Sequence, residues 1–137
     1  MTKKTYHGSC ICQGVQFEAE VDLAESGTKK CNCTRCWKLR AWSAPVAPEN
    51  FRLVSGRDLL SGYAIGGRKE LGGFCRRCGA SVFGHVPKSE WNNAERYDIS
   101  VAALDDLDPG DLISAPVTYY DGRHDNWWHA PAETRHL

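Results

Sequence analysis

Apolar and polar residues alternate over residues 14–22, the segment "GVQFEAEVD". The apolar positions are Val15, Phe17, Ala19 and Val21, and polar residues stand between them. A period of two places every second side chain on the same face, which is typical of a strand with one buried face. We therefore predict a half-buried β-strand in this segment.

Further short apolar segments follow along the chain, and turn residues separate them. Gly56, the pair Gly66 and Gly67, and the pair Asp121 and Gly122 are the turn signals. Helical signals are confined to one turn at 48–50, and the polar segment 87–96 is expected to be a loop. Strands are expected in the ranges 51–56, 63–74, 80–86, 96–104 and 115–122. The pattern predicts a single all-β domain of antiparallel sheets over residues 1–137.

Length and charge then narrow the classes of function. A chain of 137 residues is long enough to bury one core. It has 17 Lys+Arg and 17 Asp+Glu, so its formal net charge is zero and we expect no nucleic-acid partner. No apolar run is long enough to cross a membrane, and the first residues lack the apolar segment of a signal peptide. We therefore expect no membrane partner and a cytoplasmic location.

Seven cysteines point to metal chemistry. Stable disulfides are rare in a reducing compartment, where clustered thiols more often bind metal. An odd number also cannot be fully paired within one chain. The strongest single signal is the sequence C-x-x-C-G at 75–79. The cysteines form two pairs and a triplet: Cys10 and Cys12, Cys75 and Cys78, and Cys31, Cys33 and Cys36.

The spacing within these groups predicts their local backbone. Zinc–sulfur bonds of about 2.3 Å in a tetrahedron put the sulfurs roughly 3.8 Å apart. A regular strand holds residues i and i+2 about 7 Å apart. A C-x-C pair is therefore expected at a bend and a C-x-x-C pair on a tight turn. Gly14 and Gly79, which follow their pairs, are expected to supply a positive φ for these turns.

Spacing leaves two ways of dividing the cysteines between metal sites. In one, Cys33 and Cys36 join Cys75 and Cys78, and three cysteines are left over. In the other, the two pairs form one site and the whole triplet holds a second metal with three ligands. The second division uses every cysteine. It also matches the rule that structural zinc has four protein ligands whereas catalytic zinc keeps one position open, so the spacing favours it.

The order of the motifs resembles the glutathione-dependent formaldehyde-activating enzyme family, which includes relatives of centromere protein V. The resemblance extends from about Cys10 to Trp128 and implies a β-tent of packed antiparallel sheets with zinc knuckles. The chain differs from common family members at two places. Those members have a histidine where this chain has Asn32. Many also have a histidine just before the motif F-C-x-x-C-G, where this chain has Gly72 and Gly73. The motifs that carry the resemblance are "GSCICQGVQFEAEV", "CNCTRCWK", "LVSGRDLLSGY", "FCRRCGASVFG", "DISVAALDD" and "DNWW".

The resemblance implies an enzyme with two zinc ions per chain. One zinc would be structural, and the other would be catalytic and labile, with its fourth position left for a substrate thiolate. The implied activity is that of a carbon–sulfur lyase on thiol–aldehyde adducts, similar to S-(hydroxymethyl)glutathione synthase, with a small thiol such as glutathione and an aldehyde as partners. The implied structural ligands are Cys10, Cys12, Cys75 and Cys78, and the catalytic ligands are Cys31, Cys33 and Cys36.

A second hypothesis is a non-catalytic, zinc-stabilised binding module. Its triplet would be structural and completed by a ligand such as His7 or by another chain. Around the triplet, basic side chains could offset its negative charge or hold a substrate carboxylate, although a solvated loop is the simpler interpretation for each of them alone. Tryptophans could form the wall of an apolar pocket. The residues concerned are Lys29, Lys30, Arg35, Lys38 and Arg40, and Trp37, Trp42, Trp127 and Trp128.

Overall fold

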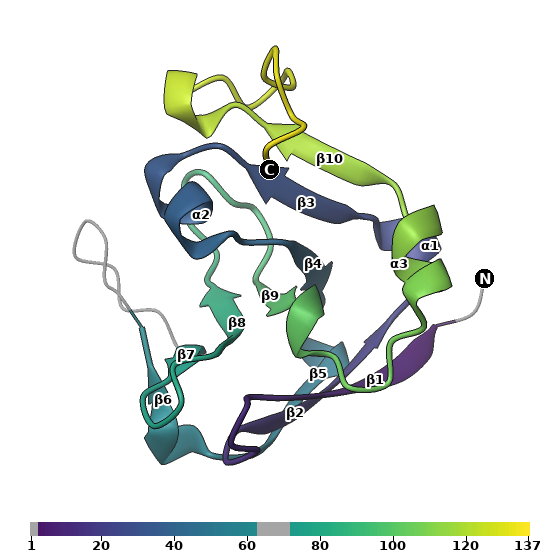
Figure 1. Cartoon of the computed structure of the whole chain (residues 1–137), viewed down its shortest axis with the longest axis vertical. Coiled ribbons are helices and arrows are strands. Elements are labelled where there is room, and N and C mark those ends of the chain that lie inside the picture. The colour runs from purple at the N-terminus through teal and green to yellow at the C-terminus, as the bar shows by residue number, and fades with distance from the viewer. Residues whose placement is uncertain (1–2, 63–71) are drawn as a thin grey trace.

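The computed structural model describes residues 3–62 and 72–137, which form two β-sheets (Figure 1). The smaller sheet is antiparallel, with the order β1-β2-β5. The larger sheet has the order β10-β3-β4-β9-β8-β7-β6. The strands are β1 (Lys4–Ser9), β2 (Gln16–Val21), β3 (Thr28–Cys31), β4 (Ser43–Val46), β5 (Phe51–Ser55), β6 (Leu60–Ser61), β7 (Gly72–Cys75), β8 (Ser81–Val86), β9 (Arg96–Ser100) and β10 (Val117–Tyr120).

Short helices connect the strands. Among the described residues, no helix has the length and apolar composition that a membrane crossing requires. The α-helices are α1 (Leu23–Ser26), α2 (Thr34–Leu39) and α3 (Pro109–Ser114). The 3₁₀ helices are η1 (Pro48–Asn50), η2 (Arg57–Leu59), η3 (Val101–Ala103) and η4 (Gly122–His124). The prediction of an all-β protein is confirmed.

One strand pair differs from the antiparallel expectation. β10 runs parallel to β3, with Val117 opposite Thr28 and Tyr120 opposite Cys31. The larger sheet is therefore mixed. This pairing brings the residues after β10 next to the cysteine triplet at the end of β3.

The alternating segment forms β2 as predicted. Phe17, Ala19 and Val21 are buried on one face, and the polar residues between them lie on the other, more exposed face. Gly8 of β1 lies opposite Phe17, with no side chain to obstruct the aromatic ring. The buried face of β2 points toward the larger sheet.

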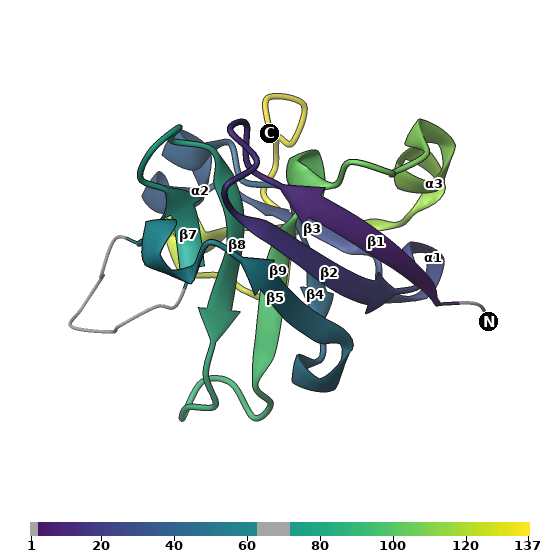
Figure 2. The ribbon, with the colours of Figure 1, turned by 90° about the horizontal axis from the view of Figure 1, so that it is seen from below.

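The core lies between the two sheets, and the smaller sheet crosses β8 and β9 of the larger one (Figure 2). Aromatic side chains connect them. Phe17 meets the ring of Phe83 edge-on at a centroid distance of 5.6 Å. Phe51 of β5 stacks on Tyr97 of β9 at 4.0 Å. Burial of such rings contributes apolar area and favourable ring geometry together, so these contacts fix how the sheets pack.

The other predicted elements are found with narrower bounds. The segments 51–56, 80–86 and 115–122 contain β5, β8 and β10, the turn at 48–50 is η1, and 87–95 is a loop. The expected strand at 96–104 ends at Ser100 and continues as η3. Of the expected strand at 63–74, residues 72–74 lie in β7, and the glycine pair at 66–67 lies outside the described residues.

Candidate metal centres

Four cysteine sulfurs meet at one place. Those of Cys10, Cys12, Cys75 and Cys78 all lie within 4.8 Å of one another. The sulfurs of Cys10 and Cys12 are 3.5 Å apart, and those of Cys12 and Cys75 are 3.8 Å apart. These distances are close to the roughly 3.8 Å expected between thiolates around tetrahedral zinc. The donor set therefore fits a four-coordinate metal ion.

This four-cysteine cluster joins the two sheets. Cys10 directly follows β1 of the smaller sheet, and Cys75 is the last residue of β7 in the larger sheet. Cys10 and Cys75 are buried, whereas Cys12 and Cys78 lie nearer the surface on their turns. A metal ion bound here would connect two sheets whose cysteines are 63 residues apart along the chain.

The two turns use different residues for their left-handed position. Gly79 has φ +84°, as predicted, and its N–H donates to the carbonyl of Cys75 at 2.7 Å. The prediction for Gly14 is wrong, because Gln13 adopts the positive φ, at 63°. A Cβ on Gly14 would lie 2.5 Å from the side chain of Leu59 and 2.6 Å from that of Arg77. Gly14 therefore provides room for close packing.

Hydrogen bonds stabilise the thiolate form on the exposed side of this cluster. The backbone N–H groups of Ala80 and Cys12 lower the pKa of Cys78 to about 6. The N–H of Gly14 and the Arg77 guanidinium lower the pKa of Cys12, and Arg77 Nε donates to its sulfur at 3.3 Å. Burial raises the pKa of Cys10. Since the thiolate is the form that binds metal, the donors around Cys12 and Cys78 prepare them as ligands.

The second cluster is the triplet, which spans the junction between β3 and α2. Cys31 ends β3, and Cys33 caps α2 by accepting a hydrogen bond from the N–H of Cys36 at 3.4 Å. The N–H of Cys33 in turn donates to the Cys31 sulfur at 3.4 Å. The change from strand to helix supplies the bend that the C-x-C spacing predicts. The three sulfurs lie within 4.8 Å of one another, and no other described His, Cys, Asp or Glu joins them.

The surroundings of the triplet favour a bound cation. Burial raises the pKa of Cys36 to about 12 and also raises the pKa of Cys31. Burial is the largest effect on Cys33 as well and would raise its pKa, but the hydrogen bonds from Cys36, Cys31 and the N–H of Arg35 together outweigh it and lower the pKa of Cys33. Three thiolates at this distance repel one another, so a positive ion among them would stabilise all three. The donor set fits a metal with three protein ligands.

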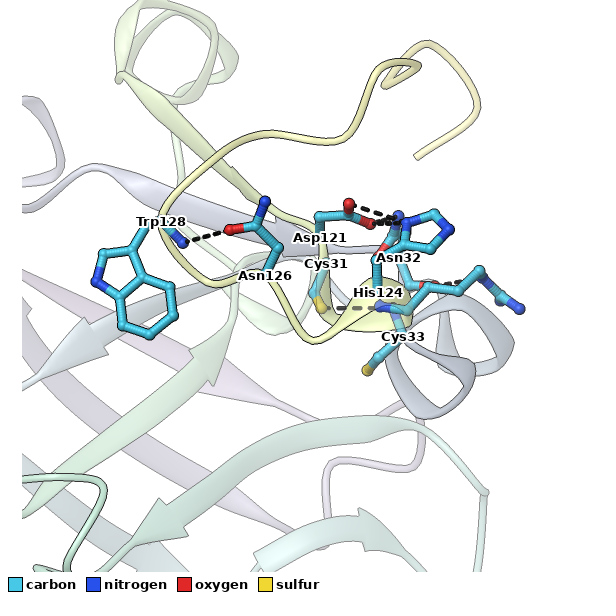
Figure 3. Close-up of polar contacts among 8 residues, drawn as sticks. Cys31, Asn32, Cys33, Asp121, His124, Asn126 and Trp128 are labelled. Carbon is cyan, nitrogen blue, oxygen red and sulfur yellow. Dashed lines mark hydrogen bonds and ion pairs between the residues drawn. The ribbon is translucent and has the colours of Figure 1, made fainter.

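A loop after β10 packs against the triplet (Figure 3). Asn32 is buried, its Nδ2 donates to Asp121 Oδ1 at 2.7 Å, and its Oδ1 accepts from the N–H of Arg123 at 2.9 Å. A Cβ on Gly122 would lie 2.8 Å from the sulfur of Cys31 and 3.0 Å from the Cβ of Cys33. Asn32 thus holds residues 121–123 beside the sulfurs.

Asp121 is the centre of this hydrogen-bond network. Both of its carboxylate oxygens lie 2.9 Å from Nδ1 of His124. The hydrogen bond from Asn32 lowers the pKa of Asp121, and the contact with His124 lowers it further. The sequence marks Asp121 and Gly122 only as a turn. Their position beside Cys31 depends on the parallel pairing of β10 with β3. No local sequence pattern predicts this pairing.

The remaining candidate residues separate into two groups. His7 lies 2.8 Å from Asp106 and 3.6 Å from Glu18, outside the triplet, and the hydrogen bond to Asp106 raises its pKa. Trp128 is 82% exposed and does not line the cavity beside the triplet, whereas Trp127 lies against Gly122. Trp37 and Trp42 line a cavity next to the triplet, together with Lys30, Arg40, Cys31 and Cys36.

Comparison with known proteins shows the family of this chain. The family model described as glutathione-dependent formaldehyde-activating enzyme matches residues 5–120, which include all seven cysteines. A crystal structure of a Rhodobacter sphaeroides protein is similar, with 31% sequence identity and a TM-score of 0.64. The similarity covers 82% of this chain and 99% of that one. This chain belongs to the glutathione-dependent formaldehyde-activating enzyme family.

Proposed function

We propose that the protein is a zinc-dependent carbon–sulfur lyase that acts on adducts of a small thiol, such as glutathione, with an aldehyde. The observation that carries this proposal is the triplet, where three sulfurs converge and no fourth described ligand joins them. Family membership supports the class of reaction. The seven cysteines would remain available as ligands in a reducing compartment such as the cytoplasm.

The two clusters would have different tasks. Cys10, Cys12, Cys75 and Cys78 would hold a structural zinc, because four thiolates leave no position for a substrate. Cys31, Cys33 and Cys36 would hold the catalytic zinc, which when bound would keep a substrate sulfur in its thiolate form. Binding and orienting the substrate would then be the task of the residues around the triplet.

The cavity beside the triplet would position the thiol substrate. It has a volume of about 130 Å³, and two sulfurs of the triplet, Cys31 and Cys36, form part of its wall. The indole rings of Trp37 and Trp42 give it apolar surfaces for the carbon chain of a small thiol. Lys30 and Arg40 add positive charge close to the sulfurs. The cavity can therefore orient a small thiol with its sulfur toward the triplet.

The reaction itself makes or breaks one carbon–sulfur bond. In the cleavage direction the bonding electron pair goes to sulfur, the hydroxyl proton leaves the adduct and the carbonyl double bond forms. In the other direction the thiolate adds to the aldehyde carbon and the new alkoxide takes up a proton. Neither direction needs an oxidant or a reductant, so the residues around the triplet suffice together with the thiol, the aldehyde and water.

Metal content provides one prediction. Protein purified under reducing conditions with zinc supplied during expression should contain two zinc ions per chain, because the cysteines group as four and three. A chelator should remove one ion well before the other, since three protein ligands bind less tightly than four. Elemental analysis with a chelator titration measures both. Cys33→Ser should keep one ion, and a single ion per wild-type chain would contradict the two-site proposal.

Reaction rate provides the test of the proposed function. Thiols add to formaldehyde without a catalyst, so the protein can change only the rate of exchange. Magnetisation-transfer NMR between a free thiol and its hydroxymethyl adduct measures this rate directly. We expect acceleration for at least one thiol–aldehyde pair and none with Cys33→Ser. A folded protein with two zinc ions that leaves every exchange rate unchanged would favour the non-catalytic binding module instead.

A further inference from the structure

Of the five basic residues that flank the triplet, two line the cavity beside it, Lys30 and Arg40. Lys30 Nζ lies 4.2 Å from the ring centroid of Trp42, and Arg40 Cζ lies 5.0 Å from that of Trp37. Each cation is therefore placed over an indole face. The cavity combines two cations, two aromatic walls and the sulfurs of the triplet.

These two cations have no acidic partner within residues 3–62 and 72–137. Lys29 shows the contrast, because its Nζ pairs with Asp98 at 2.7 Å on the other face of β3. Lys30 is half-buried, whereas Arg40 is exposed. A charged group that is partly removed from water, as Lys30 is, is usually paired with an opposite charge or bound to a ligand. An unmatched pair of cations in a cavity points to an anionic ligand.

The last two residues of the described chain already accept hydrogen bonds from both cations. Lys30 Nζ donates to the main-chain oxygen of Leu137 at 3.0 Å, and Arg40 Nη1 donates to the carbonyl of His136 at 2.6 Å. The imidazole of His136 meets Trp37 edge-on at 5.2 Å, and Leu137 lines the cavity. Two main-chain oxygens thus show where an oxygen ligand of these cations sits.

We propose that Lys30 and Arg40 determine substrate specificity by binding a carboxylate of the thiol substrate, which displaces the main-chain oxygens of residues 136–137. This inference rests on the proposed function for the identity of the substrate as a thiol. A carboxylate carries a full negative charge and a carbonyl oxygen only a partial one, so the Coulomb attraction of the two cations favours a carboxylate over these main-chain oxygens. The segment 134–137 would move away when the acid binds.

The size of the cavity limits the substrate. Its volume of about 130 Å³ is well below the roughly 300–1,000 Å³ of pockets that enclose a drug-sized ligand. A short mercapto acid fits this description, with its sulfur directed at the triplet and its carboxylate at the two cations. The substrate class is therefore a small thiol with a carboxylate a few bonds from its sulfur, or a longer thiol with one such arm.

A matched pair of thiols tests the specificity. Mercaptopropanoate and mercaptopropanol differ in the carboxylate, so exchange with formaldehyde is measured for both by magnetisation-transfer NMR. We expect the variant with Lys30→Gln and Arg40→Gln to lose about tenfold or more in rate for the acid and less than about twofold for the alcohol. Lys38→Gln is the control, because Lys38 is exposed and does not line the cavity. Equal losses for both thiols would overturn the inference.

A binding measurement separates this inference from the proposed reaction. Methylthiopropanoate has the carboxylate but no free thiol, and its binding is followed by the indole N–H signals of Trp37 and Trp42 in ¹H–¹⁵N spectra. We expect saturable shifts in the wild type, about tenfold weaker binding in the double variant, and tighter binding in a chain that ends at Glu133. If exchange is not accelerated but these shifts appear, the anion site stands and the lyase proposal fails. Shifts that are absent, or unchanged in every variant, would contradict the anion site.

Discussion

Cys75→Ser is expected to abolish the native fold. The Cys75 thiol is fully buried, and its cluster joins the ends of β1 and β7, which belong to different sheets. A structural zinc contributes on the order of 10 kcal/mol to folding in small metal-binding domains. The whole stability of a domain is about 5–15 kcal/mol, so losing this metal leaves little or none of it. Loss of dispersed ¹H–¹⁵N signals and of a cooperative thermal transition would show the effect.

A cysteine of the other cluster serves as the control. It tests whether the unfolding comes from loss of the structural zinc or from any replacement of a cysteine by serine. Cys33→Ser removes a thiol from the triplet, whose three ligands all lie within one junction between β3 and α2. This variant should remain folded and melt cooperatively with one zinc ion bound. Cys10→Ser should behave like Cys75→Ser, because it removes a ligand of the same cluster. If Cys33→Ser collapses while Cys75→Ser melts like the wild type, the structural and catalytic roles are assigned to the wrong clusters.

Predicted and missed strands do not divide simply by their buried faces. β5 and β10 were predicted although neither has a fully buried residue, and β4, which buries Ala44 and Val46, was not. β2 alternates over its whole length and was predicted, whereas β1 and β3 were not. The six residues of β1 bury only Tyr6 and Gly8, and the four of β3 bury only Thr28. Such strands are specified by their neighbours in the sheet, and tertiary context of this kind overrides local propensity. Their existence could not be read from periodicity.

The local part of each cysteine cluster could also be predicted. The C-x-C and C-x-x-C spacings require bends and turns, and the structure provides them after β1, between β3 and α2, and after β7. Spacing could not decide which pair meets which, because that depends on the packing of one sheet on the other. The same reason explains why Asn32, Asp121 and the segment 136–137 were not recognised as parts of the site. Their contacts join positions about 90 to 107 residues apart.

Gly122→Ala is expected to damage the triplet without unfolding the protein. A methyl group at this position would lie 2.8 Å from the Cys31 sulfur, 3.0 Å from the Cys33 Cβ and 2.7 Å from the Trp127 ring. The φ angle of Gly122 is not in the left-handed region, so the effect would come from contact and not from backbone strain. Either the sulfurs or the loop at 121–124 must shift. Changes next to metal ligands typically cost 10–100-fold in metal affinity.

Competition with a chromophoric chelator measures the affinity of the weaker zinc site in Gly122→Ala. We expect a loss of about 10–100-fold there, an unchanged tighter site and a fall in thiol exchange. Gly84→Ala is the control, because a Cβ at Gly84 in β8 meets nothing within 4 Å. Asn32 is hydrogen-bonded to Asp121 and Arg123, the two neighbours of Gly122, and so holds Gly122 in place. Asn32→Ala should therefore also lower the zinc affinity of the weaker site. Unchanged affinity in both variants would show that the triplet holds its metal without the loop, and that the buried Asn32 serves the fold alone.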